Sequence, residues 1–73
     1  EGAYEDAWVQ QQVRDALQEL TAEQQHVLAL RFSQERSLEE TAGILGKTVT
    51  AVKALQFRAV ASLRRLLEDR LRR

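Results

Sequence analysis

The chain lacks cysteine and proline, and only three of its 73 residues are glycine. The absence of cysteine excludes disulfides, thiolate zinc sites and a cysteine nucleophile. The absence of proline and the scarcity of glycine permit long helices and disfavour an architecture with many β-turns. The single histidine, His26, does not form a metal site alone. We therefore expect an all-α protein with no metal and no cofactor.

Long hydrophobic runs are also absent, since none approaches the roughly 20 residues of a transmembrane helix. The sequence shows no signal-peptide pattern either. We therefore expect a cytoplasmic protein without membrane insertion. The length suits one small domain, which we place at residues 6–73. Residues 1–5 are expected to be a linker or a frayed end, and the lack of an initial methionine leads us to expect a longer parent protein.

The formal net charge is zero, but the charges are unevenly distributed along the chain. Residues 1–45 hold nine acids and three bases, a net charge of −6, whereas residues 46–73 hold eight bases and two acids, a net charge of +6. A basic half suits a polyanionic partner. The alternative from charge alone is a solvated basic helix.

Apolar residues recur at three- and four-residue steps over about residues 6–19, which predicts an amphipathic first helix. The residues of this stripe are Trp8, Val9, Val13, Ala16, Leu17 and Leu20. Thr21 and Gln24 have the spacing of a capping box, in which each side chain bonds the backbone N–H of the other residue. They predict a second helix that ends near Phe32, followed by a polar loop at 33–36.

A second capping-box pair, Ser37 and Glu40, predicts a short third helix over residues 38–45. Gly46 is suited to the left-handed conformation that ends a helix. From Val49 the composition favours helix to about Leu71. The sequence therefore predicts four helices, of which the C-terminal one is long.

The segment from Ser37 to Arg58 has the spacing of a helix-turn-helix. Ala42 supplies the small residue that the crossing of two helices needs, and Gly46 follows four residues later at the turn. Val52 and Leu55 are placed to anchor the second helix on the core. An ordinary helical hairpin is the alternative reading of the spacing alone.

In a helix-turn-helix the helix from Val49 onward is the recognition helix, and its predicted exposed face holds Thr50, Lys53, Ala54 and Phe57. A lysine donates to guanine O6 and N7 or to a phosphate, and apolar side chains contact thymine methyl groups. Lys53 fits the first role, and Ala54 and Phe57 fit the second. The alternative for Phe57 is packing against the first helix at the edge of the core.

Four more side chains flank this face: Arg31, Lys47, Thr48 and Arg58. Thr48, Thr50 and the N–H groups at the helix start are suited to phosphate contacts. Thr48 is equally explained as the N-cap of the helix. Arg31, at the end of the second helix, is placed to hold a phosphate from the side, and its alternative is a surface ion pair with Glu35.

Leucines and arginines alternate in clusters near the C-terminus, where Leu63, Leu66 and Leu67 share one side of the predicted helix. Two interpretations remain open for this leucine face. It docks a protein partner, or it closes the core of this small domain.

As an ordered set, the motifs resemble region 4 of bacterial sigma factors, in particular the extracytoplasmic-function group, over about residues 9–67. The resemblance rests on these segments: 13–17 (VRDAL) with Leu20, 27–32 (VLALRF), 37–42 (SLEETA), 45–48 (LGKT), 51–53 (AVK), and 57–59 (FRA) with Leu63.

The resemblance implies a four-helix domain that reads the −35 element of double-stranded promoter DNA and docks on the β-flap of RNA polymerase. It also implies regulation by an anti-sigma protein bound to this domain. Carried over by position, the residues that touch DNA are Arg31, Lys53, Ala54, Phe57 and Arg58.

The chain departs from the family pattern at several positions. The family usually has proline where Thr21 stands, glycine where Glu35 stands, and isoleucine or valine where Thr41 stands. Ala54 replaces a polar reader of DNA, so the recognition face is poor in hydrogen-bonding groups. We therefore expect the isolated domain to bind DNA weakly.

Other classes of function have less support. Glu39 and Glu40 are adjacent and point about 100° apart on a helix, so they do not pair across a substrate, and no nucleophile–base arrangement is visible. We therefore do not expect an enzyme. The remaining alternatives are the output domain of a response-regulator-type transcription factor and a module that binds only protein.

Overall fold

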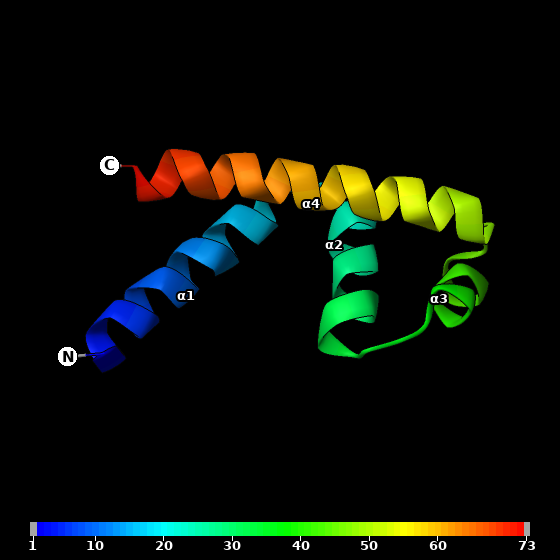
Figure 1. The fold of residues 1–73 in the computed structure, drawn as a ribbon, viewed down its shortest axis with the longest axis horizontal. Coiled ribbons are helices and arrows are strands. Elements are labelled where there is room, and N and C mark those ends of the chain that lie inside the picture. The colour runs from blue at the N-terminus through cyan, green and yellow to red at the C-terminus, as the bar shows by residue number, and fades with distance from the viewer. Residues whose placement is uncertain (1, 73) are drawn as a thin grey trace.

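The computed structural model describes residues 2–72, with side chains from residue 6 onward, and this part of the chain is helical without any strand. Figure 1 shows the elements α1 (Gly2–Gln18), α2 (Ala22–Leu28), α3 (Leu38–Leu45) and α4 (Val49–Leu71). A five-residue π-helical segment, η1 (Ala29–Ser33), continues α2 directly. The predicted all-α, four-helix class is confirmed. Along residues 2–72 there is no helical stretch with the length and hydropathy of a membrane span.

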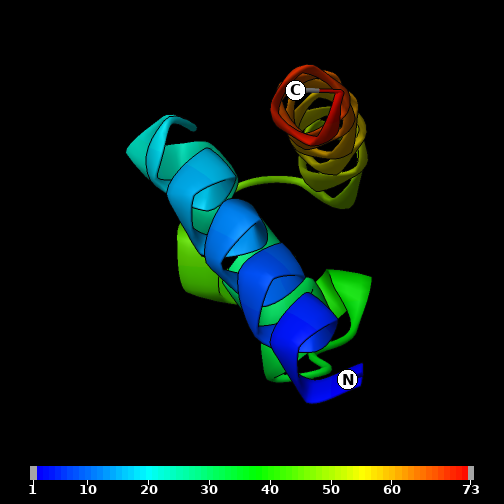
Figure 2. The same ribbon diagram turned by 90° about the vertical axis from the view of Figure 1, so that its left-hand side faces the viewer.

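Helix α4 is the axis of the molecule, which measures 42 × 21 × 15 Å. Each of the other helices contacts it. Helix α2 stands nearly perpendicular to the middle of α4, α3 lies at its N-terminal end, and α1 approaches it toward the C-terminal half (Figure 1). Viewed along α4, α1 crosses the molecule obliquely below it (Figure 2). The three shorter helices are therefore positioned by one long helix.

The core forms where one stripe of α4 meets α2, α3 and the end of α1. The buried members of this cluster are Leu20, Val27, Leu28, Ala42, Val52, Leu55 and Ala59. Val52 and Leu55 were predicted as anchors of the recognition helix, and both are buried. Leu63 and Leu66 pack against the same cluster. Leu63 and Leu66 therefore help to close the core, whether or not they also bind a partner.

Helix α1 differs from the prediction at its N-terminal end. It begins at Gly2 instead of near Asp6, because nothing in this stretch stops a helix once it has formed. Trp8 and Val9, the first two residues of the predicted apolar stripe, are 51% and 40% exposed. They lie outside the core because α1 diverges from α4 toward its N-terminus (Figure 1). Glu1 lies outside the described residues, and the domain boundary at residue 5 stays a prediction.

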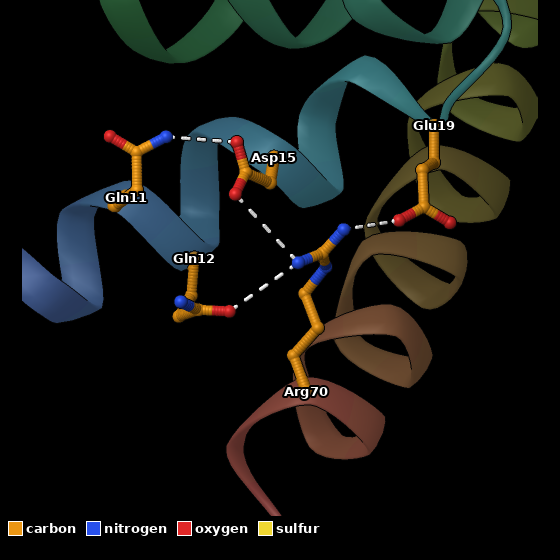
Figure 3. A network of polar contacts seen from close by, with 5 residues as sticks. All are labelled: Gln11, Gln12, Asp15, Glu19 and Arg70. Carbon is orange, nitrogen blue, oxygen red and sulfur yellow. Dashed lines mark hydrogen bonds and ion pairs between the residues drawn. The ribbon is translucent and has the colours of Figure 1, made fainter. Parts of the chain in front are cut away.

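Arg70 ties α1 to the C-terminal end of α4 (Figure 3). One guanidinium nitrogen, Nη2, lies 2.6 Å from a Glu19 carboxylate oxygen. The other, Nη1, lies 3.4 Å from the Gln12 side-chain oxygen and 3.8 Å from an Asp15 carboxylate oxygen. The sequence alone does not reveal these partners of Arg70, because they are more than fifty residues away along the chain.

The helix starts follow the predicted caps. In the first box, Thr21 and Gln24 each accept a hydrogen bond from the other's backbone N–H at 3.1 Å. In the second box, Ser37 and Glu40 do the same at 3.0 Å. The Thr48 hydroxyl accepts from the Ala51 N–H at 3.1 Å, which confirms Thr48 as the N-cap of α4.

The second helix ends near Phe32 as predicted, but its last turn widens into η1. The Gln34 N–H donates to the Ala29 carbonyl at 2.9 Å, and the Arg36 N–H donates to the Leu30 carbonyl at 2.8 Å. Glu35 takes a positive φ of 53° to close this turn. That conformation favours glycine, which explains why the resembling family usually has glycine at this position.

Thr41 generates a first prediction. It is fully buried in the helix-turn-helix, and its hydroxyl has no hydrogen-bond partner among the described residues. An unpaired buried polar group costs about 1–3 kcal/mol, and valine has nearly the same shape. We expect Thr41→Val to raise the free energy of unfolding by about 1 kcal/mol, measured by urea denaturation. Thr50→Val, on the exposed face of α4, is the control and should show no such gain.

Gly43 and Gly46 generate a second prediction, with opposite signs for the two positions. Gly43 is exposed inside α3 with open space around its Cα, so Gly43→Ala should raise the melting temperature by about 4–8 °C, the equivalent of about 1 kcal/mol. Gly46 ends α3 with φ 67°, and alanine is strained there, so Gly46→Ala should lower the melting temperature by a similar amount. Circular dichroism measures both melting temperatures. A shift of the same size and direction in both variants would contradict the assigned conformations.

Candidate nucleic-acid interface

The first half of α4 presents one face to the core and the other to solvent. Val52, Leu55 and Ala59 are buried on the inner face. The outer face exposes the predicted residues Thr50, Lys53, Ala54, Phe57 and Arg58. The structure therefore brings five predicted site residues together on one helix surface, at the three- and four-residue spacing of a helix face.

Phe57 is the most exposed large apolar residue in the described part of the chain, at 75%. The alternative that it packs at the edge of the core is therefore wrong. Ala54 lies one turn earlier on the same exposed face. Burial of a large apolar side chain against a partner is favourable. The contact of Phe57 with DNA stays a prediction.

The start of α4 places Thr48 and Lys47 beside this face. The Thr48 hydroxyl accepts the capping hydrogen bond, which leaves its own O–H available as a donor. The Lys47 ammonium lies 2.8 Å from a Glu23 carboxylate oxygen at the start of α2. Sequence reasoning did not find this ion pair, because the two residues are far apart along the chain and only folding brings them together.

Arg31 lies on η1 and reaches toward α4. Its Nε donates to the Gln56 side-chain oxygen at 2.9 Å, and its Nη1 donates to the Arg36 carbonyl. Its described partners are therefore Gln56 and Arg36 instead of the Glu35 carboxylate that the sequence offered as an alternative. These bonds hold the guanidinium beside α4, with further N–H groups available to a phosphate.

Electrostatics at this end of the molecule couple Glu23 to two of the cations. The hydrogen bond from Lys47 lowers the pKa of the Glu23 carboxyl, and the charge of Lys47 lowers it further. The positive charge of Arg58 acts on the Glu23 pKa in the same direction. Glu23 is therefore a fixed negative charge close to the proposed DNA-binding side chains.

A second surface feature is an apolar groove of about 520 Å³ between the end of α1, the α2–η1 helix and the middle of α4. Its lining residues are Leu17, Gln25, Leu28, Ala29, Phe32, Ser33, Val60 and Leu63. Of the three predicted partner-binding leucines, only Leu63 lines this groove, whereas Leu66 and Leu67 are half-buried elsewhere. Phe32, 59% exposed, was not predicted as part of a binding surface; its apolar side chain at a polar loop was the available signal.

Known proteins share this arrangement. The family model described as sigma-70, region 4 matches residues 16–65. The chain is 49% identical over 55 residues to the ECF RNA polymerase sigma factor BldN of Streptomyces coelicolor. This alignment covers 75% of this chain and 21% of BldN. It is 43% identical over 56 residues to the RNA polymerase sigma-E factor of Streptomyces antibioticus, covering 77% of this chain and 31% of that protein.

A solved structure gives the same result in three dimensions. The structure of the RsbN–BldN complex contains a chain that superimposes on this one with a TM-score of 0.75 and 44% identity, covering 78% of this chain and 41% of that one. The present chain thus spans about a fifth to a third of the length of the sigma factors that it matches. Since the match includes both helices of the helix-turn-helix and most of the core, the chain belongs to the sigma-70 region 4 family.

Proposed function

We propose that this chain is the part of an extracytoplasmic-function sigma factor that reads the −35 promoter element and so directs RNA polymerase to the start of transcription. The observation that carries the proposal is the outer face of α4, where Thr50, Lys53, Ala54 and Phe57 are exposed in a helix-turn-helix of this family. The role is non-catalytic, and we place it in the cytoplasm with the polymerase.

In this proposal the N-terminal half of α4 enters the major groove, as recognition helices do. Lys53 donates to a guanine edge or to a phosphate, and Ala54 and Phe57 contact thymine methyl groups. Arg58, Lys47, Thr48 and Arg31 hold the phosphates on either side. Phosphate contacts position the helix, and the few base contacts give the specificity.

The apolar groove supports a second contact, with the β-flap of RNA polymerase. Phe32 and Val60 are exposed at its rim and Leu63 lies within it, so an apolar segment docking there would cover surface that is otherwise in water. A flap contact would also supply affinity that the sparse recognition face lacks.

We further propose that an anti-sigma protein regulates this domain. The support is that BldN has been solved in complex with a second protein, RsbN, and that the match to BldN covers 75% of this chain. The leucine face at Leu63, Leu66 and Leu67 remains available to such a partner only at its partly exposed edges. The family match favours a sigma factor over the response-regulator output domain and over a protein-only module.

The DNA proposal predicts a specific loss of binding. Replacing Lys53 and Arg58 by glutamine should weaken binding to duplex DNA on the order of tenfold and reduce the slope of log affinity against log salt by about one for each lost phosphate contact. The measurement is fluorescence anisotropy over a salt series, together with promoter-directed transcription by the full-length protein.

A matched control removes the same charge from the far half of α4. Arg64 and Arg65 are exposed, and replacing both by glutamine should leave the DNA affinity close to that of the wild type. If this control weakens binding as much as the Lys53 and Arg58 substitutions, net charge explains the effect and the recognition face is refuted.

The groove proposal predicts a separable defect. Phe32→Gln should weaken binding to RNA polymerase core on the order of tenfold, because it replaces an apolar anchor at the groove rim, and it should leave DNA affinity unchanged. Trp8→Gln alters a similarly exposed aromatic outside the groove and serves as the control. Pull-down with immobilised polymerase core measures both, and equal losses would argue against docking in the groove.

A further inference from the structure

An acidic side chain lies among the cations proposed to bind DNA. The Glu23 carboxylate is 2.8 Å from the Lys47 ammonium, and the two side chains are 60% and 32% exposed. Lys47 immediately precedes Thr48, the N-cap of the recognition helix. The carboxylate therefore pairs with the ammonium that would otherwise be free to bind a DNA phosphate at the start of α4.

The ion pair is weak enough for DNA to displace it. Exposed pairs of this kind contribute little to stability, and duplex DNA presents a dense row of phosphates. Lysine has a long flexible stem, so the ammonium can leave Glu23 without any backbone movement. What DNA cannot remove is the negative charge itself, which remains close to the bound phosphates.

The position of Glu23 is fixed by the start of α2. The capping box of Thr21 and Gln24 holds the first helical turn, and Glu23 lies within that turn. Its charge also interacts favourably with the helix dipole there. Lys47 and Arg58 both lower the pKa of Glu23, so the carboxylate stays ionised while it faces these two cations.

We propose that Glu23 is an internal competitor, which competes with DNA phosphates for the Lys47 ammonium and so limits sequence-independent binding by this domain. The proposal rests on the proposed DNA-binding function. Because phosphate contacts supply essentially all of the non-specific affinity, a carboxylate at this point lowers binding to any duplex. Stable binding then requires the base contacts of α4 and the contribution of RNA polymerase.

A purely structural role for Glu23 makes a different prediction. As an acid in the first turn of α2, paired with Lys47, it would contribute only to the stability of the fold. Its removal would then lower the melting temperature slightly and leave DNA binding unchanged or weaker. A competitor, in contrast, gives tighter binding on removal.

The test is Glu23→Gln in the 73-residue chain, which removes the charge and keeps the shape of the side chain. The probe is a short random-sequence DNA duplex, titrated by fluorescence anisotropy over a salt series around 0.1 M. We expect the affinity to rise on the order of fivefold and the salt slope to steepen by about one, since one more lysine becomes free to contact phosphate.

Two further variants locate the effect. Glu68→Gln removes the same charge about 30 Å along α4 from its N-terminus, well beyond the ~10 Å Debye length at this salt, and should leave the affinity unchanged. In a Lys47→Gln background, Glu23→Gln should give a smaller gain than in the wild type, because the paired lysine is gone. A gain of equal size in both backgrounds would overturn the competition for Lys47.

Other results also decide the question. An unchanged or lower affinity for Glu23→Gln overturns the proposal, as does an equal gain from Glu68→Gln. The Lys53 and Arg58 substitutions test the proposed function independently. If those substitutions weaken binding while Glu23→Gln has no effect, the recognition face stands and only the role of Glu23 fails. If neither changes binding, the proposed function fails too.

Discussion

The buried stripe of α4 is the constraint on which the rest of the structure depends. Val52 and Ala59 are completely buried and Leu55 nearly so, and this stripe faces the end of α1, α2 and α3 together. Side chains on an α-helix repeat around the axis with a fixed period. Burial of these three residues therefore places Thr50, Lys53, Ala54 and Phe57 on the solvent-facing side. The same packing therefore stabilises the domain and orients the surface that we propose reads DNA.

The elements that the sequence predicted correctly depend on local interactions. The capping boxes at Thr21 and Ser37, the N-cap at Thr48 and the turn at Gly46 involve residues three or four positions apart, so their spacing is visible in the sequence. The outer and inner faces of α4 follow from the same periodicity. The placement of the DNA-binding candidates on one face was therefore predictable, although their contacts with DNA remain a proposal.

The features that the sequence did not predict depend on where distant segments meet. The apolar stripe of α1 extends toward the N-terminus as far as Trp8. Nothing in the local sequence shows that this end of α1 diverges from α4. The partners of Arg70 on α1 and the partner of Lys47 on α2 exist only in the folded chain. The π-helical end of α2 is followed closely by Glu35, which adopts a conformation that the sequence pattern would assign to glycine.

The uneven charge of the sequence also acquires a structural meaning. The pairs Glu23–Lys47, Asp15–Arg70 and Glu19–Arg70 each join an acid from the first 45 residues to a base from the remainder. One such site, at Arg70, holds α1 on the fold, and the other, at Lys47, lies next to the recognition helix. The acidic half of the chain therefore does more than balance the basic half, since it engages particular cations.

The Arg31–Gln56 hydrogen bond links the two proposed binding surfaces. Arg31 precedes Phe32 at the rim of the groove, and Gln56 precedes Phe57 on the outer face of α4. A bond of 2.9 Å between these neighbours fixes η1 against the recognition helix at the point where both phenylalanines project into solvent. A partner in the groove and DNA on α4 would thus contact two surfaces that this hydrogen bond joins directly.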